Sequence, residues 1–408
     1  MVTGIGVVAP TGMDAATHWG STVRGESALR RISRFDPAPY SSRIAGEISD
    51  FRAQDHLPSR LLPQSDHMTR LALVAADRAF EDAGVDLRSM PEYGVGVVTA
   101  STAGGFEFGQ RELEKLWSLG PQHVSAYQSF AWFYAVNTGQ ISIRHGTRGP
   151  GGVLVTDHAG GLDVVAQARR NLRQGASMMI AGGVDGSPCP WGWVAQQAGG
   201  RLSTSAEPAA AYLPFDAAAN GQVPGEGGAL LVLESAEAAR ARGVSRWYGR
   251  ILGYAATFDP APGSDRPPTL RRAVELALAD ASVTPDQVDV VFADAAGVPE
   301  LDRIEARAIR DVFGPHGVPV TAPKTMTGRL GAGGAALDLA TALLAMNENV
   351  IPPTANVSSP VPGYELDLVL LPRPAPLSIA LVLARGHGGF NAAMVCQNEP
   401  TTRKVAVR

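Results

Sequence analysis

The stretch from Gly152 to Arg170 places the tightest constraint on how this chain can fold. It opens at residues 153–155 with a short Val-Leu-Val run, which predicts a buried strand. Apolar residues then recur at helical spacing as far as Gly175, which predicts a helix. The turn at residues 157–161 joins the two and presents His158 at the helix N-terminus. Such turns often carry a nucleophile, but this one contains neither cysteine nor serine.

Composition excludes several classes of protein. At 408 residues the chain exceeds the usual size of one domain, so we expect two units or one duplicated unit. A formal net charge of −4 gives no case for a nucleic-acid partner, and no apolar run reaches the ~18 residues that cross a membrane. Cys189 and Cys396 follow no metal-ligand spacing, and we predict neither metal nor cofactor. Residues 1–10 lack the features of a leader, which predicts a cytoplasmic protein.

Strand-turn-helix units occupy matching places in two parts of the chain, which favours a duplicated α/β fold. We place the halves at residues 1–240 and 241–408, with an aromatic-rich insertion at 104–150. In the first half we expect strands at 2–8, 93–99, 153–155, 177–181 and 229–234, and helices at 14–24, 68–83 and 162–174. In the second half we expect strands at 250–258, 288–292, 318–321, 378–384 and 392–395, and helices at 269–279 and 337–344.

Four motifs in a fixed order resemble the β-ketoacyl-acyl carrier protein synthases. They are the turn at 157–163, the run PFDAAANGQVPGEGG at 214–228, KTMTGR at 324–329 and GHGGFN at 386–391. The resemblance implies a thiolase-like fold, in which two duplicated α/β halves stack as five α-β-α-β-α layers. Segments 130–144, 190–193 and 293–302 are most similar to the chain length factors, the ketosynthase β subunits of bacterial type II aromatic polyketide synthases.

The chain departs from an active ketosynthase at the residues that condense. The resemblance places His158 at the cysteine position, Asp294 and Arg329 at the two histidine positions, and Lys324 at a matching lysine. Imidazole forms no stable thioester, and a carboxylate would repel an enolate instead of stabilising it. We therefore expect no condensation by this chain alone, so any enzymatic role is that of a subunit in an acyltransferase complex. Asp294 and Arg329 are expected to form a buried salt bridge.

His158 leaves two interpretations open. It could donate a hydrogen bond to a substrate carbonyl and decarboxylate malonyl groups on a carrier protein, supplying an acetyl primer. Alternatively it fills a vestigial pocket and pairs with Asp157, Asp294 or a backbone group. A nucleotide-binding domain is disfavoured because no strand precedes a G-x-G-x-x-G motif with an acidic residue about 20 positions later. A non-enzymatic homodimeric scaffold is the remaining alternative.

The resemblance also implies partners. Strand 152–156 would pair across a two-fold axis with an active ketosynthase, which would cover an edge otherwise exposed. A growing poly-β-ketone would then enter a tunnel at the interface, and an acyl carrier protein would bind transiently.

The tunnel wall is expected to include Phe106, Gly109 and Leu113, with Phe133 and Trp193 beside them. If residues 110–117 are helical, the first three share one helix face. Glycine and leucine leave more room than threonine and phenylalanine would. The sequence therefore predicts a long product, a decaketide or above.

Overall fold

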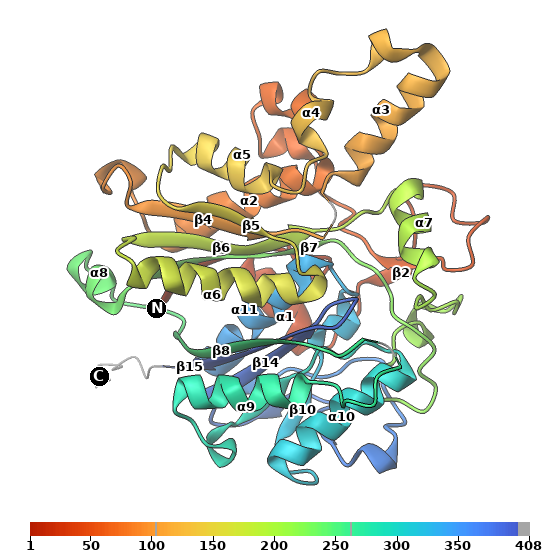
Figure 1. Cartoon of the computed structure of the whole chain (residues 1–408), viewed down its shortest axis with the longest axis vertical. Helices are drawn as coiled ribbons and strands as arrows, with labels where there is room; N and C mark the ends of the chain where they lie inside the picture. The colour runs from red at the N-terminus through yellow and green to blue at the C-terminus, as the bar shows by residue number, and fades with distance from the viewer. Residues whose placement is uncertain (103, 262, 399–408) are drawn as a thin grey trace, which may run out of the picture.

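Two β-sheets form the centre of the molecule, with strands from residues 2–234 in one and from residues 250–397 in the other (Figure 1). The computed structural model describes residues 1–102, 104–261 and 263–398. The first sheet has strand order β1-β7-β6-β4-β5. Strand β4 runs parallel to its neighbours β6 and β5, and β7 runs antiparallel to its neighbours β1 and β6. Its strands are β1 (Val2–Val8), β4 (Val95–Ala100), β5 (Gly151–Leu154), β6 (Met178–Asp185) and β7 (Gly227–Glu234).

The second sheet has strand order β12-β10-β9-β14-β15-β8. β15 runs antiparallel to both of its neighbours, β14 and β8, and the other pairs of this sheet are parallel. Its strands are β8 (Arg250–Phe258), β9 (Val290–Phe292), β10 (Pro319–Thr321), β12 (Asp367–Leu368), β14 (Ile379–Arg385) and β15 (Phe390–Gln397). Two small pairs lie outside the sheets: β2 (Leu29–Arg31) with β3 (Ile44–Gly46), and β11 (Val350–Ile351) with β13 (Arg373–Pro374).

Helices cover both outer faces and fill the space between the sheets, which confirms the predicted five-layer α-β-α-β-α arrangement (Figure 1). Helices α2 and α5 pack on the first sheet, and α9 packs on the second with α10 beside it. Helices α6 and α11 lie between the sheets. The helices are α1 (Ala15–Val23), α2 (His67–Asp82), α3 (Phe106–Leu119), α4 (Gln128–Ala131), α5 (Val136–His145), α6 (Gly160–Arg173), α7 (Pro190–Ala198), α8 (Ala236–Ala241), α9 (Leu270–Ala281), α10 (Pro299–Phe313) and α11 (Ala332–Glu348).

The middle layer explains why the central turn has its composition. Helix α11 is buried along almost its whole length because both sheets cover it. A side chain at Gly161 would place its Cβ 2.5 Å from the Ala336 nitrogen, so glycine lets α6 and α11 touch. This contact brings the turn at His158 against the start of α11. Neither α11 nor any other helix in the described part of the chain is long and apolar enough to cross a membrane.

Two expectations about the elements need correction. Strand β5 is not buried: it pairs only with β4, and its residues are exposed or half-buried at the sheet edge. Helix α10 was not predicted, although Leu301, Ile304, Ala308 and Val312 recur at helical spacing; its buried face also carries Asp302 and Glu305. The strand predicted at residues 250–258 is confirmed residue for residue as β8.

His18 ties α1 to the middle layer. Its ring is buried, with Nδ1 2.7 Å from the Thr11 hydroxyl and Nε2 2.9 Å from the Thr341 hydroxyl. Because the Thr341 hydroxyl donates to the Leu337 carbonyl, it accepts a hydrogen bond from Nε2. The neutral ring therefore satisfies both neighbours, and burial lowers the pKa of His18 to about 4 from its usual 6.5.

His18 should make the protein sensitive to acid. Above pH 6.5 the ring is neutral in both folded and unfolded chains. As the pH falls from 6.5 towards 4, the unfolded chain gains the proton first, so stability is lost in this window. Relative to His18→Gln, the wild type should lose about 3 kcal/mol of unfolding free energy between pH 7 and pH 4, measured by denaturant titration at each pH. The control is His123→Gln, at an exposed position. If wild type and His18→Gln lost the same unfolding free energy between pH 7 and pH 4, His18 would not be the source of the acid sensitivity.

Candidate functional site

A cavity of about 690 Å³ lies where the two halves of the chain meet. Its lining combines residues from α3, from the turn before α6 and from the loop between β14 and β15. It therefore brings together sequence motifs that are far apart in the chain. Among the lining side chains are Phe106, His158, Asp294, Arg329, Arg385 and Phe390.

His158 is held as a neutral ring at the base of this cavity. Its Nδ1 lies 3.0 Å from the Gly331 carbonyl oxygen, which can only accept, so Nδ1 carries the hydrogen. Burial, followed by the positive charge of Arg329, lowers the pKa of His158. Nε2 then has a lone pair and acts as an acceptor, not a donor. The sequence left open whether His158 pairs with Asp157, Asp294 or a backbone group. The structure shows that its partner is the backbone carbonyl of Gly331.

The turn that carries His158 is fixed by its neighbour. Asp157 has a φ of 51°, which is uncommon for a residue with a side chain. Its Oδ2 accepts a hydrogen bond of 2.6 Å from the His387 backbone nitrogen. This bond joins the turn to the glycine-rich loop of the second half, so the 386–391 motif has a structural role at the cavity.

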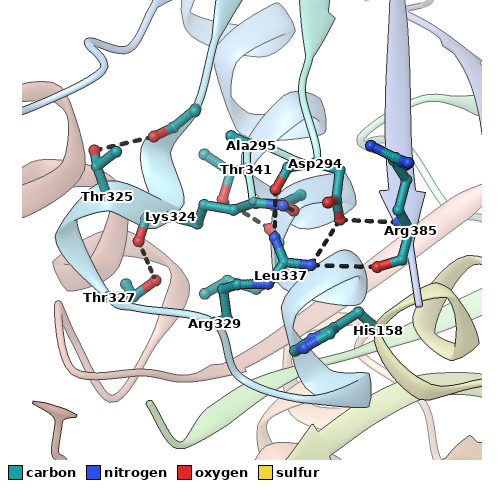
Figure 2. Close-up of polar contacts among 12 residues, drawn as sticks. His158, Asp294, Ala295, Lys324, Thr325, Thr327, Arg329, Leu337, Thr341 and Arg385 are labelled. Atoms are coloured by element: carbon teal, nitrogen blue, oxygen red, sulfur yellow. Dashed lines mark hydrogen bonds and ion pairs between the residues drawn. The ribbon is translucent and has the colours of Figure 1, made fainter. Parts of the chain in front are cut away.

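The predicted salt bridge between Asp294 and Arg329 is present (Figure 2). Arg329 Nη2 donates to Asp294 Oδ1 at 3.0 Å, and Nη1 donates to the Asp294 carbonyl at 2.7 Å. The side chains are 5% and 2% exposed. Asp294 Oδ1 also accepts from the Arg385 backbone nitrogen at 2.9 Å. Burial alone would raise the pKa of Asp294, but the nearby cations, Arg329 first, outweigh it and hold this pKa well below its usual range.

Two carboxyl groups of α10 hold the loop that carries Asp294, and sequence reasoning missed both. Glu305 accepts from the backbone nitrogens of Asp294 and Ala295 at 2.7 and 2.8 Å. Asp302 accepts from that of Gly297 at 2.9 Å. Burial raises the pKa of Glu305 to about 7 and that of Asp302 to about 6. Asp302 and Glu305 lie three residues apart, which places both on one face of a helix, and this spacing was the sequence signal that could have revealed them.

Among its described residues, the site contains no thiol that could hold an acyl chain as a thioester. Lys324 is buried with its Nζ 2.7 Å from Asp338 Oδ2, so its charge is paired. Cys189 and Cys396 are buried outside this cluster, and burial raises their pKa values to about 11 and about 12. Neither forms a reactive thiolate at neutral pH. Within the described residues no group of histidine, cysteine and carboxylate side chains is arranged to hold a metal ion.

Helix α3 begins at the cavity, and Trp191 packs against its first turns. The ring centroids of Phe106 and Trp191 are 4.6 Å apart. A Cβ added at Gly109 would lie 2.9 Å from Trp191 Cζ3. Leu113, one turn further on, is 36% exposed. The helix is confirmed, but the indole ring of Trp191, which was not expected here, fills the space beside Gly109.

The two other residues expected in the tunnel lie in different surroundings. Phe133 is exposed, with its ring centroid 4.2 Å from that of Tyr134. Trp193 is 1% exposed, donates from Nε1 to the Ser42 carbonyl at 2.9 Å and packs against Phe35. This placement contradicts the expected tunnel position of Trp193. Its neighbour Trp191 is the tryptophan of α7 that contacts α3.

A group of large apolar side chains is exposed on α3, on the segment after it and near β5. Exposed apolar area of this extent marks an interaction surface in a soluble protein. The largest exposed fraction, 83%, belongs to Trp117. The others are Leu119, Tyr127, Trp132, Phe133, Tyr134, Ile143 and Val155.

Comparisons with known proteins agree with this architecture. Family models of the β-ketoacyl synthase N-terminal and C-terminal domains match residues 1–239 and 248–358. The chain is 59% identical over 397 residues to the ketoacyl synthase β subunit of the tetracenomycin polyketide synthase of Streptomyces glaucescens, covering 97% of both chains. It is 58% identical to the actinorhodin polyketide putative β-ketoacyl synthase 2 of Streptomyces coelicolor, again covering 97% of both.

Solved structures give the same result. The ishigamide ketosynthase/chain length factor matches with a TM-score of 0.89 at 27% identity, covering 98% of each chain. A type II ketosynthase in complex with its acyl carrier protein and bound to the hexaketide (AntDE:AntF) matches with a TM-score of 0.87 at 26% identity, also covering 98% of each. The chain therefore belongs to the β-ketoacyl synthase family and, within it, to the ketosynthase β subunits, or chain length factors, of type II polyketide synthases.

Proposed function

We propose that this chain is the non-condensing partner of an active ketosynthase and that it limits the length of the growing poly-β-ketone. The observation that carries the proposal is the buried pair of Asp294 and Arg329. Arg329 is paired with Asp294 and donates to backbone carbonyls, so the pair leaves no free cation to stabilise an enolate. With neutral His158 at the cysteine position, the chain supplies shape and an interface to a reaction whose nucleophile belongs to the partner.

The surface suits a large partner. Strand β5 leaves one edge of its backbone unpaired within the described chain, and α5, which carries the exposed Ile143, contacts it. The exposed aromatic side chains lie on α3 and on the segment between α3 and α5. Pairing of β5 with the equivalent strand of a ketosynthase would join two sheets and cover these side chains. We propose a heterodimer on this surface and an acyl carrier protein as a transient partner. The solved relative in complex with its carrier protein supports the second part.

The first turns of α3 would form the wall that the product meets. Phe106 already lines the cavity, and Gly109 and Leu113 follow on the same helix. We retain a decaketide or longer product as part of the proposal, because glycine and a half-exposed leucine add little bulk of their own. Trp191 works against a long product, since its ring occupies the space beside Gly109.

The alternative function is decarboxylation of malonyl-carrier protein through His158. That role needs an N–H directed at a substrate carbonyl. In the described site the one hydrogen of the neutral ring is directed at Gly331, and the proximity of Arg329 opposes a second. The geometry therefore favours the partner role over the decarboxylase role.

The proposal can be tested with purified components. The isolated chain with malonyl-carrier protein should show neither condensation nor carbon dioxide release above background, because it has no nucleophile and no free N–H at His158. Adding a cysteine-bearing ketosynthase should give polyketide, and His158→Ala should change the rate of carbon dioxide release less than about twofold. Condensation by the isolated chain would refute the proposal. A loss of tenfold or more in His158→Ala would favour the decarboxylase.

A further inference from the structure

Helix α3 begins without a cap of its own. The residue before its first turn is Gly105, which has no side chain to accept a hydrogen bond from the free N–H groups of that turn. The helix also extends away from the two sheets (Figure 1), so its position depends on how this first turn is attached. Phe106 and Gly109, the proposed wall residues, lie in and next to this turn.

Asp66 supplies the missing cap from 42 residues away in the sequence. Its Oδ2 accepts from the Phe108 backbone nitrogen at 2.7 Å, and its Oδ1 accepts from the Met68 backbone nitrogen at 2.9 Å. Asp66 is also the N-cap residue of α2. One buried carboxylate therefore caps two helices, and the positive ends of both helix dipoles stabilise its charge.

Gly105 allows this arrangement. A Cβ at this position would lie 2.9 Å from Asp66 Cβ and 2.3 Å from the Ala131 carbonyl oxygen. The start of α3 can therefore approach Asp66 only when residue 105 lacks a side chain. The contact fixes α3 to α2, which packs on the outer face of the first sheet.

We propose that Asp66 is a positioning residue for chain-length selection, which holds the Phe106–Gly109 wall at a set distance from the partner. The proposal rests on the proposed function, because it concerns the same wall. Asp66 itself does not line the cavity. It acts through the backbone of α3.

Asp66→Asn is the direct test. An asparagine side chain offers one oxygen and one NH₂ group, so it can cap one helix while its NH₂ faces the N–H of the other. In the reconstituted heterodimer, hydrogen exchange at the Phe108 amide should become about tenfold faster or more. The product mixture should broaden to chain lengths that the wild type does not make. Asp14→Asn, at the exposed N-cap of α1, is the matched control and should change neither quantity.

Further outcomes separate this inference from the proposed function. If Asp66→Asn does not fold, Gly105→Ala pushes the same turn away from Asp66 and the Ala131 carbonyl, and it should broaden the products in the same way. A purely structural role would lower the yield of heterodimer but leave the ratio of products unchanged, which would overturn the proposal. Unchanged exchange at Phe108 would also overturn it. If Asp66→Asn and Gly105→Ala keep the wild-type products while Gly109→Thr/Leu113→Phe changes them, only the inference about Asp66 fails. If all of these variants keep the wild-type products, the proposal that α3 forms the wall of the product tunnel is refuted.

Discussion

Replacing Arg329 with methionine should lower the free energy of unfolding by about 3–5 kcal/mol, measured by denaturant titration at pH 7. The reason is the carboxylate that remains. Asp294 is fully buried, its Oδ2 has no hydrogen-bond partner in the described structure, and Arg329 is the cation in contact with it. Arg329 also donates to the carbonyl oxygens of Asp294 and Arg385, which would lose these donors.

Two further variants separate the buried charge from loss of contacts. Asp294→Asn in the Arg329→Met background removes the stranded charge and should recover at least half of the loss. Arg271→Met breaks the exposed pair with Glu275, whose side chains are 54% and 45% exposed, and should leave the free energy of unfolding nearly unchanged. If Arg329→Met cost as little as this surface control, the pair would not be holding the site together.

The salt bridge could be predicted because two complementary residue types replaced two residues of one site. The hydrogen bonds that hold the loop carrying Asp294 could not be predicted. Glu305 and Asp302 accept hydrogen bonds from backbone groups, and backbone groups are the same at every position of a sequence. Helix α10 itself could have been recognised from Leu301, Ile304, Ala308 and Val312, but nothing in its sequence marks the two carboxyl groups as buried.

The fold was more accessible to prediction, since continuous apolar runs mark strands that are covered on both faces. Strand β5 shows the limit of this argument. Its apolar residues predict that the strand is buried, but they do not say whether this chain or a partner chain buries it. Trp191 and Trp193 show a second limit: on a helix, residues two apart lie about 200° apart around the axis, so only the structure decides which one faces α3.

Gly109→Thr/Leu113→Phe should shorten the polyketide made by the heterodimer by at least one extender unit, measured by mass spectrometry of the products. The threonine Cβ would lie 2.9 Å from Trp191 Cζ3, so the indole must move from α3 towards the space where the product is proposed to lie. Phenylalanine adds bulk at position 113, one turn further along the same helix. Both changes act by volume and leave the charges of the site untouched.

The control for this pair makes the same substitutions elsewhere. Gly363→Thr has no atom within 4 Å of the added Cβ, and Leu371→Phe is at a position that is 77% exposed, so this variant should keep the wild-type product. Adding Trp191→Ala to Gly109→Thr/Leu113→Phe removes the ring that was displaced, and the product should lengthen again. If the wall variant condensed normally and still made the wild-type chain length, the length would be set by the partner or by another part of the interface, and α3 would serve only to join the two subunits.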